Sequence, residues 1–374
     1  MGSFSWVRSN EELAQAIQSV RGHDAVAVDT EFRRRDTFFP QVALVQLAVE
    51  GHCWLIDPLT LTDTDALKSL LTDPSVIKVL HSASEDLEIF EYWLGVLPRP
   101  LFDTQKAAAM LNMGFGLSYR AMVEQMLGVV LSKEETQSDW LARPLSDAQC
   151  EYAAQDVTYL CTCWPMLRAK ADARGVFAWI LAEGEAAETG GRGPLAKFKS
   201  AWKLKPVQLG VLMALVTWRE TEARRRDKPR SWILADKVMT ELAQKMPDNL
   251  PKLGEVSGIP HSVIRRDGRQ LIELIATAAN TARAQPPTPL PAPANGQVRA
   301  LAKVLAGPLA GIAEELEMNV EVLLAGRELE LIAREALGES IDPPAHWVGW
   351  RATTVIEPLR RRARVHLESQ HETG

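Results

Sequence analysis

The feature that most constrains the fold is a short apolar run, residues 25–28, which leads directly into two carboxylates, Asp29 and Glu31. A run of valine and alanine of this length indicates a buried strand. Alternate residues of a strand point to one face, so the two acids are expected to lie side by side. Neighbouring carboxylates repel each other, and a cation between them removes that repulsion. The pair therefore predicts half of a metal site, while a strand end that runs into solvent remains the alternative.

The first half of the chain alternates strand-like and helix-like segments, which is typical of an α/β domain. The predicted strands are residues 25–32, 42–49, 53–57 and 76–80. Helices are predicted at residues 66–71, at 84–93, and from a cap at Ser146 through residue 160. Beyond residue 190 the pattern becomes helical throughout, interrupted by a Pro-rich stretch at 285–296 that is too poor in apolar residues to pack.

The formal net charge of −6 hides a strong asymmetry along the 374 residues. Residues 1–190 carry −12, residues 191–284 carry +9, and residues 285–374 carry −3. Excess carboxylates suit divalent metals, and a compact surplus of Arg and Lys suits a polyanion such as nucleic acid, although a solvated basic face is the alternative. Four irregularly spaced cysteines indicate reduced thiols, and no apolar run is long enough to span a membrane. A cytoplasmic protein without a signal peptide is expected.

Two further acidic residues occur at positions where active-site side chains are often found. Asp86 follows a predicted strand at the start of a helix, a place where side chains project into a cleft. Tyr152 and Asp156 are four residues apart on the long helix, so the phenol and the carboxylate share one helix face. Taken alone, each is weak evidence, because Asp86 also suits the helix dipole and Tyr/Asp pairs are common on surfaces.

These motifs together resemble the DEDD superfamily of 3′-5′ exonucleases, in its tyrosine-containing branch. The three motifs are V-D-T-E-F at 28–32, H-S-A-S-E-D-L at 81–87 and E-Y-A-A-Q-D-V at 151–157. Within the superfamily the chain is most similar to the ribonuclease D family, because S-D-W-L-A-R-P-L at 138–145 leads into the third motif. The resemblance implies an α/β exonuclease domain with a ribonuclease H-like mixed sheet, followed by two all-α HRDC-type bundles. The implied boundaries are 1–190 for the exonuclease, 195–284 for the first HRDC domain, 285–296 for the linker and 297–374 for a second HRDC-like domain.

The resemblance also implies the catalytic and metal-binding residues. Asp29 would bridge two divalent ions, Mg²⁺ or Mn²⁺, with Glu31 and Asp156 completing one ion and Asp86 supporting the other. Hard oxygen ligands favour these metals. Tyr152 would orient the attacking water, because a phenol with an ordinary pKa near 10 is a poor base by itself.

Three neighbours are candidates for substrate binding, each with a structural alternative. Phe32 could stack on a terminal base, or belong to the core. Gln46 could contact a sugar or base edge, or satisfy a buried backbone group. Arg33, together with Arg34 and Arg35 that follow it, could bind phosphate, or stand in an exposed loop.

The expected activity is metal-dependent 3′-5′ hydrolysis of RNA that releases nucleoside 5′-monophosphates. The family implies maturation of tRNA precursors, and a monomer is expected. Two alternatives stay open: a DNA 3′-5′ exonuclease of the type associated with RecQ helicases, and a nucleic-acid-binding pseudonuclease. No G-x-x-x-x-G-K-[ST] loop occurs, so the chain carries no P-loop helicase of its own.

Overall fold

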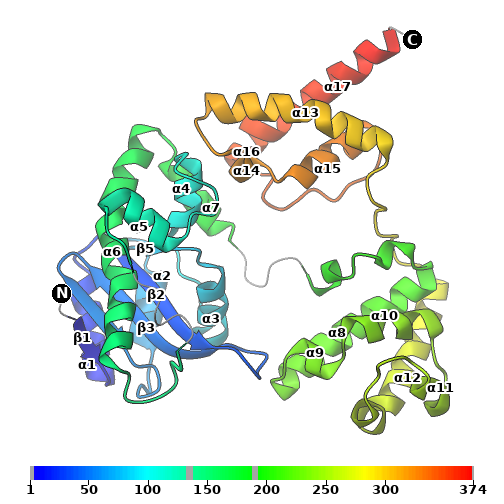
Figure 1. Ribbon diagram of the computed structural model, residues 1–374, viewed down its shortest axis with the longest axis horizontal. Coiled ribbons are helices and arrows are strands. Elements are labelled where there is room, and N and C mark those ends of the chain that lie inside the picture. The colour runs from blue at the N-terminus through cyan, green and yellow to red at the C-terminus, as the bar shows by residue number, and fades with distance from the viewer. Residues whose placement is uncertain (1–3, 132–137, 188–192, 373–374) are drawn as a thin grey trace. The chain divides into compact units, whose positions relative to one another are not determined.

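A computed structural model describes residues 4–131, 138–187 and 193–372 of the chain, with side chains up to residue 370 (Figure 1). The chain divides into two compact units. The first comprises residues 1–33, 42–189 and 294–374, and the second comprises residues 34–41 and 190–293. The expected fold class, a mixed sheet with flanking helices followed by helical modules, is confirmed. None of the described helices is long and apolar enough to cross a membrane.

The sheet has six strands in the order β1-β4-β3-β2-β5-β6. Their bounds are β1 Phe4–Val7, β2 Ala25–Arg33, β3 Gln41–Val49, β4 His52–Ile56, β5 Ile77–Leu80 and β6 Leu101–Asp103. β3 and β4 pair antiparallel, whereas β1 pairs parallel with β4, and β5 pairs parallel with β2 and β6. The four predicted strands are therefore confirmed. The sequence prediction missed β1 and β6, which are too short to give a pattern.

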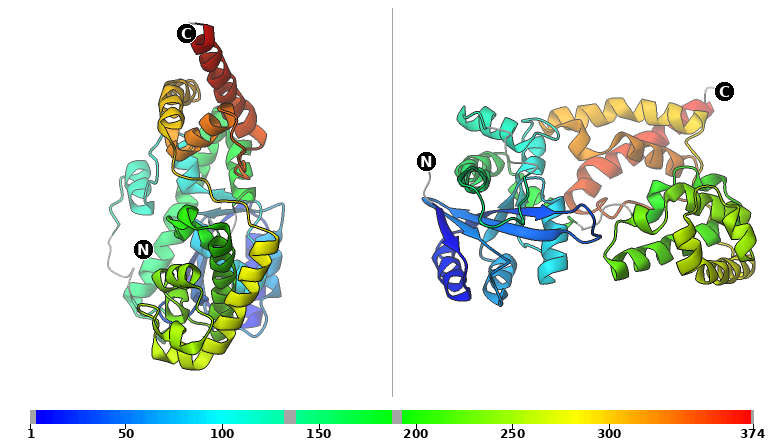
Figure 2. Two further views of the ribbon diagram at one scale, coloured as in Figure 1. Left: turned by 90° about the vertical axis from the view of Figure 1, so that its right-hand side faces the viewer. Right: turned by 60° about the horizontal axis from the view of Figure 1, so that its bottom comes forward.

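Helices cover both faces of this sheet, as the turned view shows (Figure 2, right). One face packs on three short helices, α1 Asn10–Val20, α2 Asp65–Thr72 and α3 Ser84–Leu94. The other packs on the long helix α6, Asp147–Ala173, which begins at the predicted cap Ser146 with a complete capping box. The smaller helices α4 Thr104–Met110, α5 Tyr119–Leu127 and α7 Phe177–Glu185 lie around it. We call this part, up to α7, the sheet domain.

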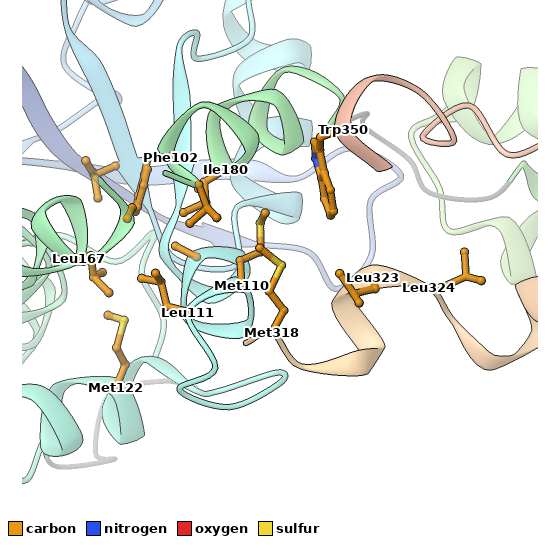
Figure 3. Close-up of a cluster of buried hydrophobic side chains, with 14 of the residues drawn as sticks. Phe102, Met110, Leu111, Met122, Leu167, Ile180, Met318, Leu323, Leu324 and Trp350 are labelled. Carbon is orange, nitrogen blue, oxygen red and sulfur yellow. The ribbon is translucent and has the colours of Figure 1, made fainter. Parts of the chain in front are cut away.

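The helices after residue 294 form a bundle of their own that shares a hydrophobic core with the sheet domain. The helices of this C-terminal bundle are α13 Gly296–Glu315, α14 Val320–Leu323, α15 Gly326–Ala336, α16 Gly349–Arg351 and α17 Glu357–Glu372, with a π-helical turn, Ala352–Ile356, before α17. Met318 lies beside Met110 of α4 (Figure 3).

An aromatic stack and an ion pair also join the C-terminal bundle to the sheet domain. Trp350 stacks on Trp179 with ring centroids 4.9 Å apart, and its neighbour Arg351 pairs with Glu183 at 2.7 Å. Arg351 also donates to the carbonyl groups of Val322 and Leu323. Through Trp350 and Arg351, α16 therefore holds the C-terminal bundle against α7.

The second unit is all-helical apart from its arm. Its helices are α8 Pro206–Arg226, α9 Arg230–Ile233, α10 Asp236–Lys245, α11 Leu250–Gly254 and α12 His261–Ala284, preceded by two 3₁₀ turns, Pro194–Lys197 and Ala201–Lys203. Residues 34–41, the loop between β2 and β3, belong to this unit, and Phe38 is buried in its core. We call this loop the arm.

Candidate active site

The two acids of the first motif emerge from the sheet on the face that packs against α6. Ala25 and Ala27 are buried in the core that α6 shares, and Asp29 and Glu31 continue the same alternation toward the end of β2. Val26 and Val28 point to the opposite face, into the core formed with α1 to α3. The predicted side-by-side placement of the acids therefore agrees with the structure.

The long helix brings a third carboxylate to this pair. Ligand oxygens of Asp29, Glu31 and Asp156 all lie within 4.8 Å of one another. The three residues come from a strand and from a helix more than one hundred residues later, so their meeting is a product of the tertiary fold. This separation is short enough for one ion to contact all three.

Asp86 approaches from the other side of β2. It is buried in the first turn of α3 and accepts a hydrogen bond of 2.5 Å from the Thr30 hydroxyl. Thr30 lies between the two acids in sequence and points to the opposite face, so it links Asp86 to the strand that carries Asp29 and Glu31. Asp86 is outside the close group of three carboxylates, although its charge raises the pKa of Asp29 and of Glu31.

Burial raises the pKa of every acid in this cluster, and repulsion from the other acids of the cluster adds to it for Asp29 and Glu31. Desolvation is the largest cause for each. It raises the pKa of Glu31 to about 9, with further contributions from Asp156 and Asp86. The pKa values of Asp86 and Asp156 rise to about 7, and that of Asp29 rises well above its usual range. No basic side chain among the described residues is a cause that lowers these pKa values.

Tyr152 stands one turn before Asp156 on α6 and hydrogen-bonds to its carboxylate. Burial, followed by the charges of Asp156, Glu31 and Asp29, holds the pKa of the phenol well above its usual range. In the metal-free protein this environment favours the protonated phenol, which can donate or relay a hydrogen bond.

The segment before α6 holds Tyr152 in place. Trp140 is buried and its ring lies 6.0 Å from the ring of Tyr152. Arg143 binds both carboxylate oxygens of Asp57, at 2.7 and 2.8 Å, and donates to the carbonyl of Ala43. The S-D-W-L-A-R-P-L motif thus ties the start of α6 to the sheet.

A pocket of about 310 Å³ opens over these acids. Its lining includes Asp29, Glu31, Tyr152 and Asp156, together with His81 and Tyr119. His81 is held between Thr104 Oγ1 at 2.9 Å and the carbonyl of Leu117 at 3.0 Å, and burial lowers its pKa. His81 is therefore held in a fixed orientation, and its environment favours the uncharged ring.

The three residues predicted to bind substrate lie in different environments. Arg33 ends β2 on the same face as Glu31, and Phe32 is half-buried on the opposite face. Gln46 is completely buried on β3, outside the lining of the pocket, and its amide oxygen and nitrogen find no partner among the described residues. Their roles toward substrate stay predictions.

Sequence reasoning missed the residues that support the acids. Thr30 anchors Asp86, and Tyr119 donates to the carbonyl of Gln155, beside Asp156, at 2.8 Å. Asp103 caps α4 and accepts from the backbone of Ser82 and Ala83, which fixes the turn that leads into α3. Asp103, as the last residue of a strand before a helix, carries a cap signal. The other two contacts depend on tertiary structure.

The donor set fits a divalent metal. It consists of carboxylate oxygens, the ligands that Mg²⁺ and Mn²⁺ prefer. Arg120 also lines the pocket, but no described basic side chain is among the causes that set the raised pKa values of Asp29 and Glu31. Among the described residues that line the pocket, none offers a sulfur ligand. Divalent metals are also the usual cofactors of DEDD exonucleases.

Comparisons with known proteins agree with this arrangement. Residues 4–172 match the family model described as 3′-5′ exonuclease, and residues 208–275 match the model of the HRDC domain. The chain is similar to ribonuclease D of Pseudomonas paraeruginosa, with 39% identity over 95% of this chain and 96% of the relative. It is also similar to ribonuclease D of Escherichia coli, with 34% identity over 96% and 97% of the two chains.

Among solved structures, the crystal structure of Escherichia coli RNase D superimposes with a TM-score of 0.87 at 33% identity. The match covers 96% of this chain and 98% of that one, which is described as an exoribonuclease involved in structured RNA processing. The catalytic core of RRP6 from Trypanosoma brucei shares the fold, with a TM-score of 0.57 at 20% identity. One HRDC domain is matched, and the second HRDC-like domain expected at 297–374 stays a prediction.

Proposed function

We propose that four acids and one tyrosine carry out the reaction of this protein. The premise is that the chain belongs to the ribonuclease D family of 3′-5′ exoribonucleases. These residues are Asp29, Glu31, Asp86, Asp156 and Tyr152. The observation that carries the proposal is the half-buried group of Asp29, Glu31 and Asp156, whose oxygens lie within 4.8 Å of one another and whose pKa values no described basic side chain lowers.

Two divalent ions, when bound, supply the charge that activates a water and stabilises the leaving 3′ oxygen. Asp29 would contact both ions, which is supported by the repulsion that Asp86, Asp156 and Glu31 all exert on its carboxylate. Glu31 and Asp156 would hold the ion on the nucleophile side, and Asp86 would support the second. Whether Mg²⁺ or Mn²⁺ serves in the cell is not set by oxygen ligands alone.

Tyr152 would orient the attacking water through its hydroxyl. Its proton already points to Asp156, so the phenol oxygen has lone pairs left to accept a hydrogen bond from water. The rings of Trp140 and Tyr119 flank this part of the site and limit the positions that Tyr152 and α6 adopt. The proton of the attacking water leaves to solvent or to a free carboxylate oxygen, since the environment of the phenol favours its protonated form.

The substrate is RNA, and we propose precursors of tRNA as the substrates that are trimmed in the cytoplasm by a monomeric enzyme. Residues 191–284 carry a charge of +9, which suits the binding of a folded polyanion next to a nuclease that takes its 3′ end. The structured RNA named for the Escherichia coli relative is the same class of substrate.

The test uses 5′-labelled RNA and DNA oligomers, incubated with Mg²⁺, Mn²⁺ or EDTA, with the products resolved by length. We expect a ladder from the 3′ end of RNA with either metal and none with EDTA. A tRNA precursor with a 3′ extension should be shortened and should then resist further trimming. Equal trimming of DNA would favour the RecQ-associated type of exonuclease, and the absence of any ladder would favour a pseudonuclease.

A further inference from the structure

A second pocket, of about 450 Å³, lies entirely within the second unit of the chain. One wall is the arm, with Arg34, Arg35 and Phe38. The other walls come from the first 3₁₀ turn, from α8 and from the region of α9, and they carry Lys197, Arg219, Arg230 and Ser231. The helices of the second unit and the arm, which follows β2, thus form one cavity together.

Positive charge dominates this lining, because five cationic side chains face one carboxylate, Asp236. Arg219 is almost completely buried, pairs with Asp236 and donates to the carbonyl of Leu234 at 2.9 Å, while its Nε has no acceptor among the described residues. Arg230 pairs with Glu220. A buried guanidinium with a half-exposed partner projects a positive field into the cavity, since the protein interior screens poorly.

Two cations at the rim of the pocket are left for a ligand. Arg35 and Lys197 are both exposed, and neither makes an ion pair or a hydrogen bond within the part of the chain that the structure describes. Ser231, also on the lining, adds a hydroxyl donor. Arginine, lysine and serine are the side chains that most often bind nucleic-acid phosphates.

The arm is held firmly enough to form a wall. Asp227, which ends α8 in the left-handed conformation, accepts hydrogen bonds from the backbone of Phe38 and Phe39 at 2.9 and 3.1 Å. The ring of Phe38 is buried between the guanidinium groups of Arg224 and Arg230, at 4.8 and 4.6 Å from its centroid. These contacts fix the loop that presents Arg34 and Arg35.

We propose that this pocket binds a backbone phosphate of the RNA on the 5′ side of the nucleotide being removed. The proposal rests on the proposed function, because it assumes that the RNA 3′ end lies at the acids of β2. Arg34 follows Glu31 by three residues, so the covalent chain alone keeps their Cα atoms within about 11 Å. β2 thereby carries the proposed metal ligands, and the arm that directly follows β2 forms one wall of the phosphate pocket.

The test compares two double variants of the full-length protein that change the charge equally. Arg35→Glu with Lys197→Glu alters the pocket, and Arg265→Glu with Arg269→Glu alters exposed cations of α12 in the same unit. Affinity for a labelled single-stranded RNA is measured in EDTA at several salt concentrations, so binding is separated from cleavage. Melting curves check that both variants are folded.

We expect the pocket variant to bind RNA about 10-fold more weakly than the α12 variant at low salt, with a salt slope reduced by about 1.4 for two lost contacts. Equal affinities and equal slopes of the two variants would overturn the proposal. The proposal would also be overturned if the pocket bound the released product instead of the RNA backbone. In that case adenosine 5′-monophosphate would displace RNA from the wild-type protein at concentrations that do not displace it from the pocket variant. A wild-type protein that failed to cleave RNA would count against the proposed catalytic residues, while the salt slopes would still decide the pocket.

Discussion

Two clusters of buried and half-buried carboxylates in this chain are opposite in their electrostatics. In the second unit, Arg226 bridges Glu222 and Asp267, with distances of 2.5 and 2.7 Å, and Arg266 adds a contact to Asp267 at 3.0 Å. Burial alone would raise the pKa of Asp267, but the hydrogen bonds from these arginines lower it. In the sheet domain, the acids around Asp29 have raised pKa values.

The difference separates structural charge from functional charge. In the Arg226 cluster, opposite charges balance each other within the protein, and the ion pair favours one arrangement of α8 against α12. Buried carboxylates without partners destabilise the fold, and a protein retains them where a ligand supplies the missing charge. The acid cluster has no such cationic partner among the described residues, whereas Arg226 balances the charges of Glu222 and Asp267, although its own Nε finds no acceptor there.

The largest expected effect comes from Asp29→Asn. Removing this charge should take hydrolysis of RNA below detection, by about 10⁴-fold or more, because the cation site loses its central ligand. Single-turnover trimming of a labelled RNA measures the rate. Glu151→Gln, an exposed acid on α6, is the control and should cleave normally. Activity of Asp29→Asn within tenfold of wild type would show that Asp29 is not a ligand.

Tyr152→Phe should lower the rate of hydrolysis by about 10²- to 10³-fold, the loss typical of a positioned hydroxyl. The fall should lie in kcat and leave KM nearly unchanged, because the ring still packs on Trp140. Tyr159→Phe removes a hydroxyl from the same helix two turns later and serves as the control. If both variants kept the wild-type single-turnover rate, Tyr152 would be a packing residue only.

Neutralising one acid in each cluster should move stability in opposite directions. In EDTA at pH 8, Glu31→Gln should raise the melting temperature of the sheet domain, because the amide is neutral as it stands, whereas Glu31, with a folded-state pKa of about 9, must take up a proton on folding. Asp267→Asn should destabilise the second unit by about 2 kcal/mol, since it leaves Arg226 with one partner fewer. Scanning calorimetry of the full chain measures both. Destabilisation of equal size in the two variants would contradict the contrast between the clusters.

The smallest effect is a pH dependence of opposite sign in the two clusters. Glu31 has a folded-state pKa of about 9, against 4.5 ordinarily, so the folded state binds the proton more tightly and stability falls as pH rises through this range. Metal-free protein should lose about 5 °C or more of melting temperature between pH 5 and 9. The lowered pKa of Asp267 gives stability that is present above its unfolded-state pKa and lost as pH falls. A melting temperature of the sheet domain that rose from pH 5 to 9 in EDTA would oppose this account.

The sequence predicted the parts of the site that obey local periodicity. Strand alternation placed Asp29 and Glu31 on one face, and helical spacing placed Tyr152 beside Asp156. That the two pairs meet could be inferred only through the family resemblance, because nothing local joins β2 to α6.

Other contacts gave no signal in the sequence. The Thr30 hydroxyl reaches Asp86, 56 residues away, and Asp227 caps the arm at Phe38, 189 residues away. Arg34 and Arg35 were expected either to bind phosphate or to lie in an exposed loop. They line a pocket with Arg219 because the ring of Phe38 is buried in the core of the second unit. Hydrophobicity alone would assign Phe38 to the core around β2 and β3.

The central claim is that the acid cluster is completed by a divalent cation, and one titration tests it most directly. Melting temperature and RNA hydrolysis are followed as Mg²⁺ or Mn²⁺ is added to metal-free protein, for the wild type and for Asp29→Asn. The wild-type melting temperature should rise with the logarithm of metal concentration above the dissociation constant, and hydrolysis should appear over the same range. Asp29→Asn should show neither response. A wild-type protein that hydrolysed RNA in EDTA, with a melting temperature indifferent to metal, would contradict the account.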